Sequence, residues 1–377
     1  MALILAVVGC LVLFLGWAAL PLLPSLIEAR RRTDIKPLRV VRTSDVDIRH
    51  FAKAFQAWVE GHLGEALAVC RAGGGPVQGQ LGDGTPYVAL PDGAAPALTT
   101  PPTGPVSCGA VVLGSGNLSL PPRALFPHEA YAAGSVEVGE QSVCRAILAG
   151  GDLQLGRGCW SLRWLHARAS LLARESCALH GRASADVSMR LEEGCRFERL
   201  HAPTVAFGTP VPPTPVSQER EPYTATDVPN LVEDAAGRWL VRRRLEIPAH
   251  RLVKSDLVVT GELRVGAGTR IVGNLKSHGD LYLAAGVVVE GSVVAGRDLS
   301  VGRGCDIRGP VVAERDGRIE AGTQVGSAKR PTTLSVRGLE IEAGSVVHGT
   351  VWAHGGGLVL PRPDAADPAA GPAEGSN

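Results

Sequence analysis

An 18-residue repeat near the C-terminus constrains the fold of this chain most strongly. Three consecutive copies keep six columns in register, beginning with Leu263, Leu281 and Leu299. Within each copy apolar positions alternate with polar ones, and Gly separates the alternating runs, so each unit reads strand, corner, strand, corner, strand. A fixed period without a helical pattern is typical of solenoids. We therefore predict a mainly β chain in which each unit is one coil of a parallel β-helix, stacked about 4.8 Å from the next.

The repeat extends beyond these copies in both directions. Downstream it continues to Trp352, interrupted by four additional residues within Ser327–Thr333, which we expect to bulge from a corner. Upstream a degenerate version recurs, in which Cys159, Cys177 and Cys195 are again 18 residues apart. The sequence thus predicts two arrays of about five coils each.

These signals give a domain plan for the whole chain. The predicted segments are a transmembrane anchor at 1–29, a small mixed segment at 30–107, a first array at 108–207, a Pro-rich linker at 208–250, a second array at 251–357 and a disordered tail at 358–377.

The N-terminal segment has the length and composition of a single membrane span. Ala2–Ile27 contains no charged side chain and is long enough to cross a hydrocarbon core of about 30 Å. The basic residues Arg30, Arg31 and Arg32 follow it, which under the positive-inside rule places the bulk of the chain in the cytoplasm. A cleaved signal peptide is the alternative, but a basic region before the apolar run is missing.

The mixed segment contains one clear amphipathic helix. Asp47–Leu63 carries Phe51, Phe55 and Trp58 at helical spacing. We expect this helix to pack on the solenoid, and a partner helix or a membrane surface is the alternative occupant of its apolar face.

The sequence offers few groups for catalysis or for binding. Basic and acidic residues balance at 38 and 37, which gives no electrostatic footprint for nucleic acid. No Cys-x-x-Cys pair occurs, so no zinc site is predicted. Cys159, Cys177, Cys195 and Cys305 share one inward column, and we expect them to be buried, reduced thiols. We predict no catalytic, cofactor-binding or metal-ligating residue.

Histidines near corners of the second array leave an enzymatic alternative open. His278, His348 and His354 invite comparison with hexapeptide-repeat acyltransferases, in which a loop His acts as general base. The sustained six-residue repetition of that class is missing, and exposed corner histidines explain the same positions.

The stretch GELRVGAGTRIVGNLKSHGDLYLAAGVVVEGSVVAGRDLSVGRGCDIRGPVVA resembles a bactofilin domain, the polymer-forming cytoskeletal family of bacteria. The resemblance is good over Leu252–Trp352 and weaker over Gly114–Phe207. It implies a right-handed, roughly triangular β-helix that assembles end to end without nucleotide. It also implies a membrane-associated scaffold at the bacterial inner membrane that positions envelope or cell-shape partners. A periplasmic β-helix that binds glycan is an alternative, and it requires the opposite topology.

A β-helix has two open ends, and unpaired strand edges either pair with another chain or must be covered. Docking of one array on the other and association between molecules are both possible outcomes. The predicted self-association residues are Leu252, Val253, Leu257, Val351 and Trp352.

Overall fold

The computed structural model describes residues 48–100, 104–211, 219–229, 231–233 and 237–363, together with residues 9, 10, 14 and 17. The chain divides into two units, Met1–Asp47 and Ile48–Asn377, and the fold described below is that of the second unit. The expected anchor at 1–29 lies outside the described residues except at those four positions, and Arg30, Arg31 and Arg32 lie outside them entirely. Among the described residues, no helix is long and apolar enough to cross a membrane.

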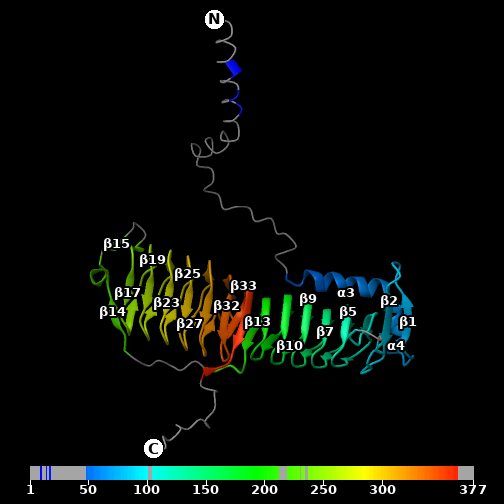
Figure 1. Cartoon of the computed structure of the whole chain (residues 1–377). Helices are drawn as coiled ribbons and strands as arrows, with labels where there is room; N and C mark the ends of the chain where they lie inside the picture. Colours follow the sequence, from blue (N-terminus) through cyan, green and yellow to red (C-terminus); the bar gives the residue numbers. More distant parts are fainter. Residues whose placement is uncertain are drawn as a thin grey trace, which may run out of the picture. The chain divides into compact units, whose positions relative to one another are not determined.

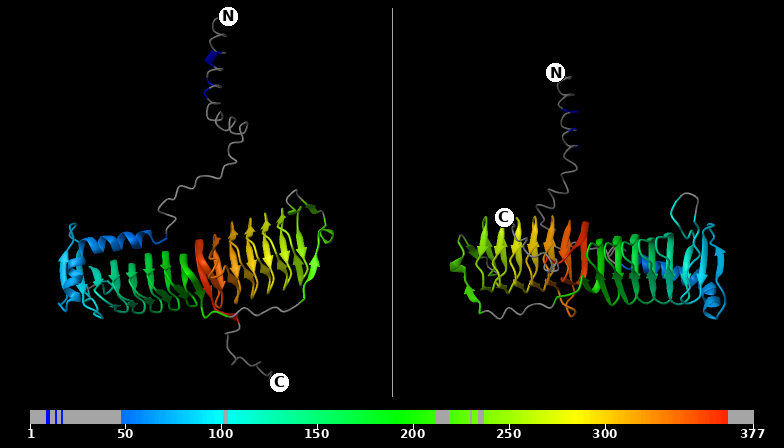
Figure 2. Two further views of the ribbon diagram at one scale, coloured as in Figure 1. Left: turned by 180° about the vertical axis from the view of Figure 1, so that it is seen from behind. Right: turned by 60° about the horizontal axis from the view of Figure 1, so that its bottom comes forward.

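The second unit is a rod, a parallel β-solenoid of about 13 turns (Figures 1 and 2). The predicted mainly β, parallel solenoid is therefore confirmed. The prediction of about five coils in each array is wrong, because several turns carry sequences too degenerate to follow the repeat. The turns can be counted on one outward-facing row of paired residues, six from the first array and seven from the second. This row runs Ser107, Leu125, Val143, Trp160, Ala178, Arg196, then Leu358, Glu340, Arg318, Ser300, Tyr282, Arg264 and Glu246.

The first array stacks two kinds of strand in parallel register. The longer strands are β3 (Val111–Gly114), β5 (Leu125–Ala132), β7 (Val143–Ala149), β9 (Trp160–Ala167), β11 (Ala178–Ala185) and β13 (Arg196–Phe207). The shorter strands are β4 (Leu118–Leu120), β6 (Val136–Val138), β8 (Leu153–Leu155), β10 (Ser170–Ala173) and β12 (Ser188–Leu191).

The second array has three short strands in each turn, as the repeat predicted. One ladder comprises β14 (Glu221–Tyr223), β18 (Arg251–Val253), β21 (Arg270–Ile271), β24 (Val288–Val289), β27 (Asp306–Ile307) and β30 (Gln324–Val325). The next comprises β16 (Trp239–Val241), β19 (Leu257–Val259), β22 (Leu275–Ser277), β25 (Val293–Ala295), β28 (Val311–Ala313) and β31 (Thr332–Val336). The third comprises β17 (Leu245–Ile247), β20 (Leu263–Val265), β23 (Leu281–Leu283), β26 (Leu299–Val301), β29 (Gly317–Ile319) and β32 (Leu339–Glu342). The long strand β33 (Val346–Leu360) pairs with the last member of each ladder.

Two boundaries of the second array differ from the prediction. The segment 208–250, expected to be a linker, contains β14, β16, β17 and the hairpin strand β15 (Leu231–Glu233), which pairs antiparallel with β16. A short 3₁₀ helix, η3 (Ala225–Asp227), follows β14. The array also continues past 357 to Leu360. The insertion near Ser327 behaves as predicted, since β28 still pairs with β31 across it.

One corner of each turn holds its backbone in the left-handed region. In the second array glycine occupies this position at Gly268, Gly286 and Gly304, with φ of +66°, +69° and +64°. Glycine adopts these angles without the steric cost that a Cβ atom brings. In the first array Gln141 and Ser176 hold φ of +57° and +60° at the equivalent corner, which is one reason why the repeat is harder to recognise there.

A short helix and a hairpin cover the outer end of the first array, and a longer helix lies along its side (Figure 1). The helix expected over Asp47–Leu63 is present as α3 (His50–His62), and α4 (Gly64–Arg71) follows it. The hairpin of β1 (Val77–Gln80) and β2 (Pro86–Leu90) extends the first sheet, since β2 pairs with β3. Helix α3 lies along the strands of the first array (Figure 1), with the Phe55 ring 5.7 Å from that of Trp164. The predicted packing of this helix on the solenoid is therefore confirmed.

Candidate functional site

The two arrays meet through their C-terminal ends. Strand β13 of the first array pairs antiparallel with β33 of the second, with Arg196 opposite Leu358 and Leu200 opposite Val351. The strands continue side by side across this joint in both views of Figure 2. We call this β13–β33 contact the joint. Because both arrays run toward it, the chain direction reverses there and the two solenoids form one rod.

Glycines in β33 make room for the joint. A Cβ atom at Gly357 would collide with the ring of Phe197, which is 2% exposed. Other turns of the second array carry Leu299 or Leu339 at this inward position, so Phe197 fills a volume that a leucine occupies elsewhere. Its ring centroid also lies 5.5 Å from that of Phe207. The two arrays therefore share one continuous apolar core.

The five predicted self-association residues have strand partners on both sides. Val253 pairs with residues of β14 and β21, as its neighbour Leu252 does, and Leu257 pairs with residues of β16 and β22. Val351 is buried in the joint, and Trp352 is 38% exposed beneath the guanidinium of Arg199, whose central carbon lies 4.5 Å from the ring centroid. None of the five forms an open strand edge, so a self-association surface has to be sought elsewhere.

The predicted cysteine column is buried, and no described cysteine forms a disulfide. Among the described residues, no cluster of side chains could hold a metal ion. Each thiol donates a hydrogen bond to a carbonyl oxygen of the preceding turn. The Sγ–O distances are 3.1 Å for Cys159 to Gly139, 3.1 Å for Cys177 to Gly156, 3.0 Å for Cys195 to Arg174 and 3.2 Å for Cys305 to Ala284. Burial raises the pKa of the Cys305 thiol to about 12.

Sequence reasoning missed this donor role, although a signal for it was present. Other turns place a hydroxyl at the same position after the left-handed corner. Ser142, Thr269, Thr323 and Ser345 donate to the carbonyl oxygens of Pro121, Pro248, Gly302 and Glu320 at 2.9, 3.0, 3.1 and 3.0 Å. Cys, Ser and Thr at this position have in common that they are small and can donate a hydrogen bond. Such a donor stabilises the fold, because a buried carbonyl oxygen without a hydrogen-bond partner lowers the free energy of unfolding.

A second cluster has the residue types of a catalytic triad. His166 Nδ1 lies 2.9 Å from the Ser184 hydroxyl, and its Nε2 lies 3.8 Å from Asp186. The Ser184 side chain is 1% exposed, and Arg49, just before α3, forms an ion pair with Asp186 at 2.9 Å. Burial lowers the pKa of His166. In this arrangement Ser184 is not accessible to a substrate, and the cluster fixes the start of α3 to the rod.

The histidines that suggested an acyltransferase lie apart from one another. His354 stacks on Trp352 at 4.2 Å between ring centroids and contacts the Ser335 hydroxyl at 3.2 Å. His348 contacts Thr204 across the joint at 3.1 Å. His278 is exposed on a corner of the rod.

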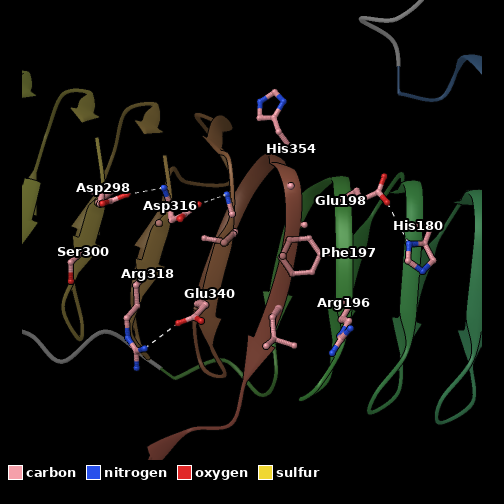
Figure 3. Close-up of a pocket in the computed structure, with 18 of the residues that line it drawn as sticks. His180, Arg196, Phe197, Glu198, Asp298, Ser300, Asp316, Arg318, Glu340 and His354 are labelled. Atoms are coloured by element: carbon pink, nitrogen blue, oxygen red, sulfur yellow. Dashed lines mark hydrogen bonds and ion pairs between the residues drawn. The ribbon is translucent and has the colours of Figure 1, made fainter. Parts of the chain in front are cut away.

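A groove of about 970 Å³ crosses the joint on the face that carries the outward row (Figure 3). We call it the joint groove. Glycines and Leu358 of β33 line its centre. The first array contributes His180, Arg196 and Glu198 on one side, and the second contributes Tyr282, Asp298, Ser300, Asp316, Arg318 and Glu340 on the other. His354 stands at its edge.

Several charged side chains that line the joint groove form ion pairs, either with one another or with an arginine just outside it. Arg318 lies 3.1 Å from Glu340, His180 lies 3.4 Å from Glu198, and Asp316 lies 3.2 Å from Arg337. The hydrogen bond from Arg337 lowers the pKa of Asp316. The groove therefore presents many donors and acceptors but little net charge.

No family model, no curated protein and no solved structure matches this chain. The resemblance to bactofilins stays a prediction.

Proposed function

We propose that this protein is a non-enzymatic scaffold whose working part is the rod. The observation that carries the proposal is the joint, which joins two solenoids into one run of paired strands. Each turn is bonded to the next through its backbone and shares a close-packed interior with it, so the rod holds its two ends at a fixed separation. About 13 turns at about 4.8 Å each give a length of about 60 Å.

We place this scaffold at the bacterial inner membrane, with a single-pass anchor at 1–29 and the rod in the cytoplasm. The uncharged run Ala2–Ile27 and the basic residues Arg30, Arg31 and Arg32 support this orientation. Three short strands per turn agree with the triangular coil that the bactofilin resemblance implies, and that resemblance is also the basis for proposing a right-handed coil. Its partners would be envelope or cell-shape proteins.

Self-association is proposed at the outer end of the second array. Among the described strands, β14, β15 and β17 each pair with one neighbour, which leaves an edge of each without a strand partner. Tyr223, Val228 and Trp239 are buried beneath this end, while Val232 of β15 is 50% exposed on it. An exposed apolar side chain beside open strand edges favours contact with another chain.

The test is sedimentation of the full chain in detergent over a range of concentrations, with Val232→Glu as the disruptive variant. We expect the parent chain to form assemblies and Val232→Glu to shift the distribution toward single rods. Val272→Glu is the matched control, because Val272 is 40% exposed on the side of the rod. A parent chain that stays monomeric at every concentration, or equal effects of both variants, would contradict self-association at this end.

A further inference from the structure

The joint groove has a low centre, and the aromatic ring of Tyr282 lies at one end of it. Gly355, Gly356 and Gly357 have no side chains, so the backbone of β33 and Leu358 form its floor. On the side of the second array, Tyr282 is the last residue of the outward row that lines the groove. The central carbon of the Arg264 guanidinium lies 4.3 Å from the centroid of the Tyr282 ring. Beyond the opposite wall Trp160 is 52% exposed, and its ring lies 5.9 Å from that of His180.

The length of the groove suits an extended chain rather than a compact ligand. From Arg196 to Tyr282 the outward row takes five strand spacings, about 24 Å. The residues between them are Leu358, Glu340, Arg318 and Ser300, which offer one apolar contact and several hydrogen-bonding groups in succession. A ligand lying along the rod axis would meet a new side chain at every strand.

The charge pattern separates the candidate classes of ligand. Nucleic acid and other polyanions require an excess of positive charge. Here Asp298, Asp316 and Glu340 are held in ion pairs with Arg315, Arg337 and Arg318, so neither a polyanion nor a polycation meets an excess of unpaired charge. A purely apolar segment would leave these groups without water or partners. The remaining match is a neutral chain that carries many hydroxyl groups.

We propose that the joint groove binds a neutral oligosaccharide. A pyranose ring has a flat face of C–H groups and a rim of hydroxyls. Successive rings would use different parts of the groove: one would place its C–H face on the Tyr282 ring and another on the glycine floor, while the hydroxyls of the rings between them would exchange hydrogen bonds with the Arg318–Glu340 pair. Carboxylates and guanidiniums that already hold one another in place bind hydroxyls with little further loss of side-chain entropy. The inference is independent of membrane anchoring, because the groove lies entirely within the rod.

The experiment is calorimetric titration of the purified full chain in detergent with cellohexaose, maltohexaose and chitohexaose. We expect at least one hexasaccharide to bind with a Kd of about 1 mM or tighter. Tyr282→Ala and Glu340→Gln should each weaken that binding about tenfold, equivalent to about 1.4 kcal/mol. Glu246→Gln is the matched control, because Glu246 lies on the same outward row but at the outer end of the rod.

Circular dichroism melting of each variant separates loss of binding from loss of folding, and Glu340→Gln conserves the size of the side chain if Tyr282→Ala proves unstable. The proposal is overturned if none of the three hexasaccharides binds. It is also overturned if Glu340→Gln and Glu246→Gln have equal effects, or if a mixed peptide library occupies the groove in their place.

Discussion

At the scale of single residues, the donor column explains why a solenoid this thin carries cysteines. In eight turns a Cys, Ser or Thr donates a hydrogen bond to a corner carbonyl oxygen of the preceding turn. The spacing of the cysteines was visible in the sequence, and their burial could be predicted from it. Their hydrogen-bonding role was not predicted, because the acceptor is a corner carbonyl oxygen of the preceding turn, whose position becomes visible only when the turns are stacked; Ser142, Thr269 and Thr323 share that role.

The raised pKa of Cys305 makes stability depend on pH. An unfolded thiol loses its proton near pH 8.5, whereas the folded chain keeps the Cys305 proton until about pH 12. Above the unfolded pKa the unfolded state therefore binds fewer protons, and this contribution to stability falls as the pH rises from about 8.5 toward 12. We expect Cys305→Ser to keep the hydrogen bond and to reduce the loss of stability in urea unfolding between about pH 8 and 10. Cys10→Ser, at an exposed thiol, is the control, and identical slopes for the two variants would refute the argument.

At the scale of elements, the joint depends on the ring of Phe197 filling the space that a side chain at Gly357 would otherwise occupy. We expect Phe197→Gly to cost at least about 3 kcal/mol by leaving a cavity, and Gly357→Leu to cost about 1–3 kcal/mol or more by overpacking. The double variant should lose less free energy of unfolding than the two single variants together, because leucine at 357 restores the residue type found in neighbouring turns. Urea unfolding of the three variants measures this coupling.

The control pair for this cycle is Phe197→Gly with Leu281→Ala. Leu281 lies several turns away from Phe197, so the losses in the free energy of unfolding should add for these two substitutions. Additive costs for the Phe197 and Gly357 pair would mean that the two side chains do not share one space. This coupling was beyond sequence reasoning, since no repeat relates β13 to β33 and their pairing is antiparallel, whereas the turns within each array stack in parallel. The coil pattern within Leu263–Val311, by contrast, was predicted strand by strand, because local alternation and corner glycines determine it.

At the scale of the whole molecule, the orientation across the membrane is the open prediction. Arg30, Arg31 and Arg32 follow the apolar run, so the C-terminus should face the cytoplasm. A C-terminal alkaline phosphatase fusion should be inactive in intact cells, and a C-terminal green fluorescent protein fusion should fluoresce. An active phosphatase fusion would place the rod outside the cytoplasm and contradict the proposed orientation.

The described chain of the rod begins and ends near the middle of the rod. On the N-terminal side Arg49 is fixed to Asp186, one turn from β13, and on the C-terminal side Leu360 pairs with Glu342 beside the joint. Both tips of the rod are therefore N-terminal ends of a solenoid, and the two tips differ. Helix α4 and the β1–β2 hairpin cover one tip, whereas β14, β15 and β17 leave strand edges without a described partner at the other. Contact between copies through the open tip would pair rods end to end and stop at two, because the covered tip offers no such edge.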